Sequence, residues 1–210
     1  MFKAQRQIAA NDLPGSAERL ALLQLAIRML TAAGYVYIGM DHFALPDDGL
    51  SIAKRNGTLH RSFQGYTTHA QRDLVALGVS AIGRIGDLYV QNQKTLKAYN
   101  AAIDRGELPA QRGVHCTVSD RVRGEIIQQI MCRGYIDLDD IESRFQVRFR
   151  EHFAAEMARL AGMAADGLLE LSESRVALTP TGRFLMRNVA MVFDEYLATR
   201  NQQIPQSRVV

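Results

Sequence analysis

A helical run that ends at a glycine and leads directly into strand-forming residues restricts the fold of this chain more than any other feature. From Ser16 onward, leucine and isoleucine recur at helical spacing between Leu20 and Leu30. Gly34 stands where a helix C-terminus prefers glycine, and the β-branched and aromatic residues 35–38 follow at once. This order is half of a βαβ unit. We therefore expect an α/β region, with the helix buried against a sheet and the strand paired in parallel.

Polar residues follow this predicted strand, where parallel sheets place their chemistry. Asp41 and His42 are either an acid–base pair or a polar pair that stabilises a loop, and the sequence leaves both interpretations open. Asp47 or Asp48 is expected to cap a short helix that reaches Lys54. Residues 77–86 form a strand-like run with several glycines. They predict a close approach either of a ligand or of another backbone segment.

The second half of the chain has a different pattern after a probable boundary at residues 106–113. Thr117 and Asp120 form a capping box, and Gly134 ends the helix that follows. Two further helices, a β-hairpin over residues 168–178 and a last helix capped by Thr179 are predicted next. Helix, helix, helix, hairpin, helix is the order of a winged-helix domain. The sequence thus predicts two domains, 1–106 and 107–210.

Composition excludes several classes of protein. The 210 residues are 47% apolar and 22% charged, with a net charge of +3 and no dense basic run. The tip of the predicted hairpin, Ser172–Ser174, carries an acidic residue where a DNA-contacting wing is basic, so no nucleic-acid partner is expected. We also expect no membrane span and no signal peptide. Cys116 and Cys132 are interpreted as reduced thiols of a cytoplasmic protein.

Four ordered motifs are specific enough to indicate a family. They are the run from Gly34 to Asp48, the run LHRSFQGYTT over residues 59–68, Gly78–Ile82 and QNQK over residues 91–94. Together they closely resemble the carboxyl-terminal half of the bacterial oxygen-independent coproporphyrinogen III oxidases. The resemblance runs along the whole chain to its closing residues, 207–210.

The resemblance implies a radical S-adenosylmethionine enzyme of heme biosynthesis. In that family a partial TIM-type barrel holds S-adenosylmethionine and a four-iron–four-sulfur cluster. Two propionate side chains of the porphyrinogen are oxidatively decarboxylated to vinyl groups, which gives protoporphyrinogen IX. By this resemblance the chain is an α/β (α+β) protein. It would comprise the last helix–strand units of the barrel and a mostly helical, winged-helix-like C-terminal domain, and the full enzyme would be a monomer.

The resemblance also implies three cofactor-binding positions. Ile82 is expected to contact S-adenosylmethionine through its backbone or by packing on the adenine, and Phe63 and Gln64 are expected to line the cavity of cofactor and substrate. No catalytic residue and no metal ligand are assigned. The family's C-x-x-x-C-x-x-C cluster motif does not occur in this sequence. The chain is therefore expected to be a truncated or shortened form that is inactive without the cluster-binding half.

Two other functions stay open at this point. The chain is alternatively a heme- or porphyrin-binding module related to the oxidase, or a winged-helix nucleic-acid-binding protein. A heme titration tests the first alternative. Salt-sensitive DNA binding would be the mark of the second.

Overall fold

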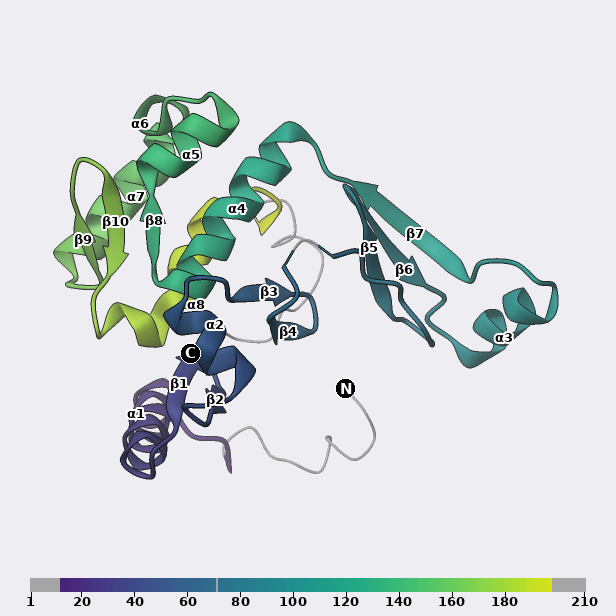
Figure 1. The fold of residues 1–210 in the computed structure, drawn as a ribbon, viewed down its shortest axis with the longest axis horizontal. Helices are drawn as coiled ribbons and strands as arrows, with labels where there is room; N and C mark the ends of the chain where they lie inside the picture. The colour runs from purple at the N-terminus through teal and green to yellow at the C-terminus, as the bar shows by residue number, and fades with distance from the viewer. Residues whose placement is uncertain (1–11, 71, 198–210) are drawn as a thin grey trace.

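The computed structural model describes residues 12–70 and 72–197. It shows a mixed α/β chain, as predicted, in which one central helix lies among the other helices and four small sheets (Figure 1). The predicted similarity at residues 207–210 lies outside the described residues. In chain order the elements are α1 (Ser16–Ala32), β1 (Val36–Gly39), β2 (His42–Ala44), α2 (Gly49–Arg55), β3 (His60–Ser62), β4 (Gly65–Thr67), β5 (Ile82–Ile85), β6 (Leu88–Asn92), α3 (Leu96–Asp104), β7 (Ala110–His115), α4 (Val118–Arg133), β8 (Tyr135–Asp137), α5 (Leu138–Phe145), α6 (Phe149–His152), α7 (Ala154–Ala165), β9 (Leu169–Leu171), β10 (Arg175–Leu178), the 3₁₀ helix η3 (Gly182–Leu185), α8 (Met186–Ala190) and η4 (Met191–Phe193).

The predicted parallel pairing of the first strand is wrong for the described residues, whose strand pairings are all antiparallel. β1 pairs with β2, the segment that follows it directly. The reason is local: Gly39 has a φ of 159° and Met40 a φ of 54°, so the chain reverses as soon as β1 ends. A left-handed residue at such a position is what a tight hairpin requires.

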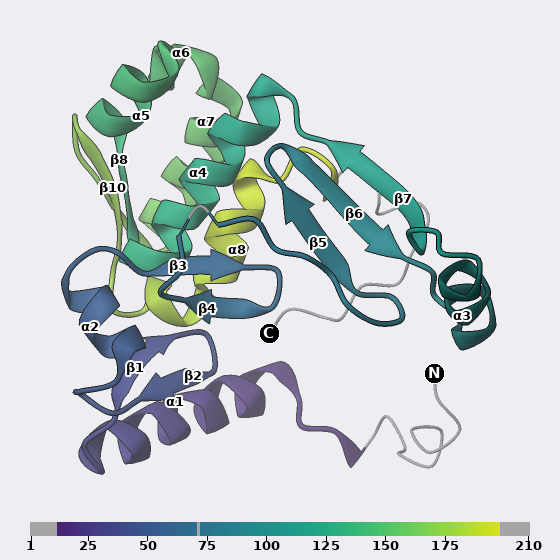
Figure 2. The same cartoon turned by 45° about the vertical axis from the view of Figure 1, so that its right-hand side comes forward.

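The helix α1 forms over the predicted residues, and Gly34, with a φ of 91°, follows its C-terminus as expected. Its predicted burial is wrong, because α1 has no buried residue. Leu22 and Met29 are 51% and 63% exposed. Its N-cap is Gly15 rather than Ser16, and no side chain caps it. The helix lies along one side of the molecule beside β1 and β2 (Figure 2). The apolar residues of its predicted face are half-buried, whereas Leu22, Leu25 and Met29 are exposed.

Strands β5, β6 and β7 form an antiparallel sheet that projects from the body as an arm (Figures 1 and 2). The helix α3 stands at the far end of the arm, between β6 and β7. Of these elements the sequence predicted a strand only within residues 77–86. The remaining strands and α3 were missed, although six of the nine residues of α3 and the first three residues of β6 are apolar or aromatic.

The caps of α4 and the hairpin that the sequence predicts for the C-terminal half are observed. Thr117 and Asp120 form both bonds of a capping box at the start of α4, and Gly134 follows it in the left-handed conformation. The predicted hairpin is β9 paired with β10, and β10 also pairs with β8.

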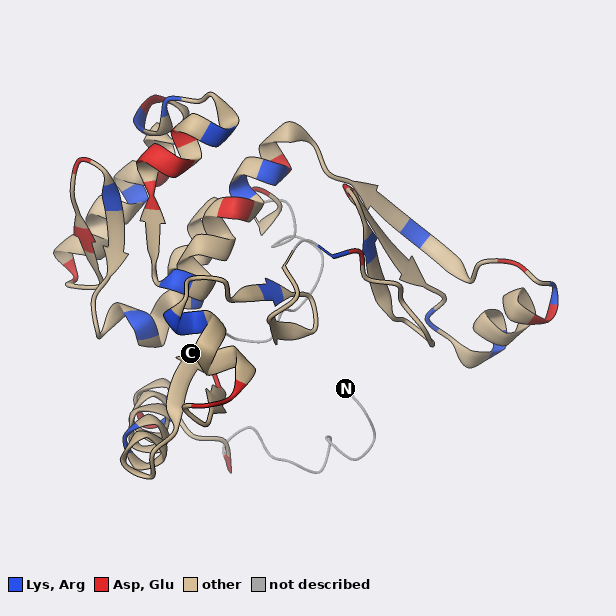
Figure 3. Cartoon of the chain, viewed as in Figure 1, with Lys and Arg blue, Asp and Glu red and all other residues tan. Residues whose placement is uncertain are grey.

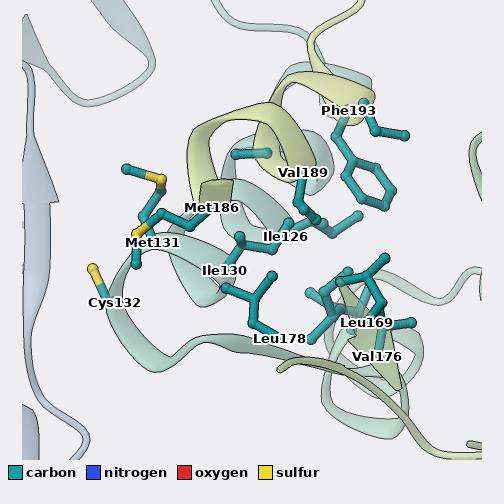
Figure 4. Packing of buried hydrophobic residues seen from close by; sticks show 14 of the residues in the cluster. Ile126, Ile130, Met131, Cys132, Leu169, Val176, Leu178, Met186, Val189 and Phe193 are labelled. Carbon is teal, nitrogen blue, oxygen red and sulfur yellow. The ribbon is translucent and has the colours of Figure 1, made fainter. Parts of the chain in front are cut away.

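The core lies around α4. Ile126 and Ile130, on the buried face of α4, contact the C-terminal helices and the sheet of β8, β9 and β10 (Figure 4). Phe149, Phe153 and Phe193 are fully buried and their rings meet edge to face or tilted. This aromatic cluster packs α6 and α7 against η4, which contains Phe193.

Two predicted helices of this half are interrupted. The third is divided into α6 and α7 at Phe153, whose φ and ψ of −110° and 34° are not helical. The last begins with a turn at Thr179, whose hydroxyl accepts from the Gly182 N–H at 3.0 Å, and it continues as η3 before the short α8.

Within the described ranges, no helix combines the length and the apolar character needed to cross a membrane.

Candidate functional site

The candidate site is a cavity of about 490 Å³ between the β3–β4 hairpin, the segment before β5, and the sheet of the arm. Its wall combines aromatic, amide and cationic side chains. Its size lies in the range of roughly 300–1,000 Å³ that is usual for small-molecule sites.

The β3–β4 hairpin is fixed onto α4 by hydrogen bonds from both of its strands. In β3 the Arg61 N–H donates to Oε1 of Gln128 at 3.0 Å, and the Gln128 amide donates back to the Arg61 carbonyl. In β4 the Tyr66 hydroxyl donates to the Met131 carbonyl at 2.9 Å. Burial raises the pKa of Tyr66, so this hydroxyl keeps its proton. The hairpin is thus held firmly while its turn, residues 63–64, points away from α4.

The structure brings the three predicted cofactor residues to the same cavity. Phe63 and Gln64 form the turn between β3 and β4, and Ile82 begins β5 on the facing wall. Phe63 is 69% exposed, so its ring is accessible to a ligand in the cavity. Gln64 is also exposed, so its amide is free to donate to and accept from a ligand.

A close contact with the segment before β5 explains why β5 has glycine at position 83. A Cβ at this position would lie 2.6 Å from the Leu74 carbonyl oxygen and 3.1 Å from the Ala76 nitrogen. Leu74 and Arg84 exchange two backbone hydrogen bonds across this contact, at 2.7 and 2.9 Å. Of the two interpretations that the sequence left open, close approach of another backbone segment is therefore the one observed at Gly83.

Asp41 and His42 lie at the β1–β2 turn and do not line this cavity. His42 Nδ1 is 3.0 Å from an Asp41 carboxylate oxygen, and the His42 ring stands edge-on to Tyr66 with centroids 5.2 Å apart. The Asp41 side chain is 83% exposed. The His42 ring thus packs against the β3–β4 hairpin, and both interpretations of the Asp41–His42 pair stay predictions.

A lysine on α2 stabilises the end of β1. The Lys54 ammonium donates to the carbonyls of Tyr37 and Ile38, the second at 2.8 Å. Burial, together with the nearby Arg183 cation, lowers the pKa of Lys54 to about 8.

The residues of this chain do not fit an iron–sulfur cluster. Such a cluster needs at least three cysteine thiolates when S-adenosylmethionine takes the remaining iron site. The sequence has two cysteines, and both are free thiols in the structure. Burial raises the pKa of Cys132 to about 12, which disfavours the thiolate. No group of three or more potential metal ligands occurs among residues 12–70 and 72–197.

Sequence reasoning missed the arginines of the cavity. Arg61, Arg72 and Arg84 all line it, from β3, from the segment before β5 and from β5 itself. Lys and Arg positions are visible on these three segments in Figure 3. A signal was available, since Arg61 stands two positions before Phe63 in a motif that carries the family resemblance.

The comparisons with known proteins confirm that resemblance. Residues 117–185 match the family model of the HemN C-terminal domain. The chain is 50% identical over 202 residues to the oxygen-independent coproporphyrinogen III oxidase of Pseudomonas aeruginosa, over 96% of this chain and 44% of the relative. It is 44% identical over 210 residues to the protein of that name from Escherichia coli K12, over 100% of this chain and 46% of the relative.

A solved structure of the Escherichia coli protein, described as a radical SAM enzyme, superposes with a TM-score of 0.88 at 45% identity. The match covers 93% of this chain and 45% of that one. The chain thus spans about half the length of these relatives.

Proposed function

We propose, from the premise that this chain corresponds to the carboxyl-terminal part of the oxygen-independent coproporphyrinogen III oxidases, that it forms one wall of the cavity in which coproporphyrinogen III is oxidised. The single observation that carries the proposal is the similarity to the Escherichia coli enzyme, with a TM-score of 0.88 over 93% of the chain. The proposed reaction is oxidative decarboxylation of two propionate side chains to vinyl groups, which gives protoporphyrinogen IX in heme biosynthesis.

In this proposal Phe63, Gln64 and Ile82 contact S-adenosylmethionine. The cofactor supplies the radical chemistry when it is bound. Phe63 and Ile82 offer apolar surface from opposite walls, which suits a flat adenine, while the Gln64 amide can hydrogen-bond in both directions. The exposed ring of Phe63 supports this role, since covering it with a ligand removes apolar surface from water.

The iron–sulfur cluster is not held by this chain, whose cysteines do not fit it. Its ligands therefore come from residues outside this sequence. We expect the 210 residues alone to show no oxidase activity.

We propose that α1 and β1 are part of a barrel of the TIM type. Support comes from the uncovered apolar side chains of α1, among them Leu22, Leu25 and Met29, and from β1, which has a strand partner on only one edge within the described residues. A neighbouring helix–strand unit from the remainder of the enzyme would cover both. A free apolar face and a free strand edge are otherwise unfavourable in water.

The division into domains 1–106 and 107–210, and the winged-helix character of the second, stay predictions. The helices and the hairpin from α4 to α8 support the second, although the sheet of β5, β6 and β7 extends across the predicted boundary. A monomeric enzyme without a nucleic-acid partner also stays a prediction. Free cysteines support a cytoplasmic location.

A chimera tests the proposed function. The matching segment of the Pseudomonas aeruginosa oxidase is replaced by this chain, and anaerobic conversion of coproporphyrinogen is followed with S-adenosylmethionine and a reductant. The expected result is formation of protoporphyrinogen IX. The relative with its matching segment deleted is the negative control. A folded, cluster-loaded chimera that binds S-adenosylmethionine but makes no product would refute the proposal.

A further inference from the structure

The charge of the candidate cavity is unbalanced. Arg61, Arg72 and Arg84 line it, whereas Asp73 supplies the one carboxylate among its described lining residues. Asp73 uses its Oδ1 to accept from the Gly86 N–H at 2.8 Å. None of the three arginines forms an ion pair with another described residue.

A neighbouring cavity is closer to charge balance than the candidate site, because Asp87, Asp120 and Glu125 line it together with its arginines. That cavity, of about 740 Å³, shares His60, Arg84, Tyr89 and Gln128 with the first. Its other cations are largely neutralised: Arg121 pairs with Asp87 at 3.0 Å, and Arg144 with Glu125 at 2.9 Å. Cations that are already paired with carboxylates of the wall attract an external anion only weakly.

Both the backbone and the guanidinium of Arg61 are fixed by neighbouring residues. Its backbone is fixed to Gln128 on both sides, and its guanidinium stacks on the Tyr66 ring, 4.7 Å from the centroid. Its Nη1 is buried and has no hydrogen-bond partner within the described residues. A buried, unsatisfied donor of a charged group is costly, and the stacking on Tyr66 keeps the rest of the guanidinium at the wall of the cavity.

Arg84 faces the cavity from the opposite wall. Its Nε donates to the Gly86 carbonyl at 3.1 Å, and its guanidinium lies 5.7 Å from the centroid of the Tyr89 ring. Burial and the Arg84 cation lower the pKa of His60, so His60 is neutral near pH 7 and the positive charge there is that of the arginines.

We propose that Arg61, Arg72 and Arg84 bind propionate carboxylates of the tetrapyrrole substrate. The inference rests on the proposed function and names the binding residues of the same cavity. S-adenosylmethionine carries one carboxylate and two positive charges, so three uncompensated guanidinium groups do not suit it alone. A tetrapyrrole with four carboxylates balances them, and guanidinium is the side-chain group that binds carboxylate with two parallel hydrogen bonds.

The test uses coproporphyrin III, the air-stable, fluorescent tetracarboxylate with the same side chains. Its binding to this chain is measured by fluorescence anisotropy, next to deuteroporphyrin IX, which has two carboxylates. The expected result is saturable binding, tighter for the tetracarboxylate and weakened by salt. Arg61→Gln and Arg84→Gln are each expected to weaken coproporphyrin binding by about 10- to 100-fold.

Matched variants separate recognition from folding. Arg61→Lys keeps the charge but not the planar fork, and is expected to lie between wild type and Arg61→Gln. Arg72→Gln changes an exposed side chain, so it is expected to weaken binding without loss of stability. Arg148→Gln, which removes an 81% exposed arginine paired with Glu151 outside the cavity, is expected to bind as wild type.

Three results would overturn the inference: no saturable binding, equal affinity for the two porphyrins, or folded Arg61 and Arg84 variants that bind like Arg148→Gln. The chimera separates this failure from failure of the proposed function. An active chimera whose KM for coproporphyrinogen is unchanged by Arg61→Gln contradicts the role of the arginines alone. A chimera that makes no product contradicts the function itself.

Discussion

Replacing Gly83 by alanine is expected to loosen the wall of the cavity that carries Ile82. The new methyl group would lie 2.6 Å from the Leu74 carbonyl oxygen and 3.1 Å from the Ala76 nitrogen. Both are backbone atoms, so the segment before β5 must move. The movement breaks the two hydrogen bonds between Leu74 and Arg84. At about 0.5–1.5 kcal/mol for each bond, the loss is roughly 1–3 kcal/mol.

The matched control is Gly162→Ala in α7, where an added Cβ meets no atom within 4 Å. Both substitutions reduce the entropy of the unfolded chain by a similar amount, so the difference between the two variants isolates the clash. Urea unfolding measures that difference, and Tm is expected to differ by about 2–4 °C for each kcal/mol. Equal unfolding free energies for the two variants would refute the reasoning, because the segment before β5 would then move away from the added methyl group without loss of stability.

Three further outcomes follow from the structure. Phe153→Ala is expected to lower the free energy of unfolding by about 3–5 kcal/mol, because the ring is fully buried against Phe149 and Phe193; a loss below about 1 kcal/mol in urea unfolding would contradict the packing. Folding lowers the pKa of Lys54 to about 8, so the unfolded chain binds more protons between pH 8 and 10; wild type should therefore gain stability relative to Lys54→Met as pH rises through this window, and a constant difference between the two curves would exclude the effect. Phe63→Ala is expected to leave stability nearly unchanged, since the ring is 69% exposed, and to raise the S-adenosylmethionine KM of the chimera; unchanged kinetics would remove Phe63 from the cofactor site.

Local signals account for the parts of the fold that the sequence predicted. Thr117 and Asp120 cap α4 through groups three residues apart, and Gly134 ends it, so each interaction can be read from neighbouring residues. The pairing of β1 could not be read in this way. A strand-forming run does not specify its partner, and the reversal depends on the conformations of Gly39 and Met40. The burial of α1 was overestimated because apolar spacing predicts which face is apolar, and does not show what covers it.

The candidate site was predicted in part. Phe63, Gln64 and Ile82 were assigned through family motifs, and the structure brings all three to one cavity. Arg61 and Arg84 were missed. They come from β3 and β5, which are separated in sequence by β4 and the segment that follows it, and they line one cavity only when the arm folds beside the hairpin.

The most direct test of the central claim is anaerobic oxidation of coproporphyrinogen III, measured side by side for the 210-residue chain and for the chimera after identical iron and sulfide reconstitution. We predict product from the chimera and none from the chain alone, because two cysteines cannot hold the cluster. Turnover by the chain alone, or an inactive chimera with an intact cluster and bound S-adenosylmethionine, would contradict it.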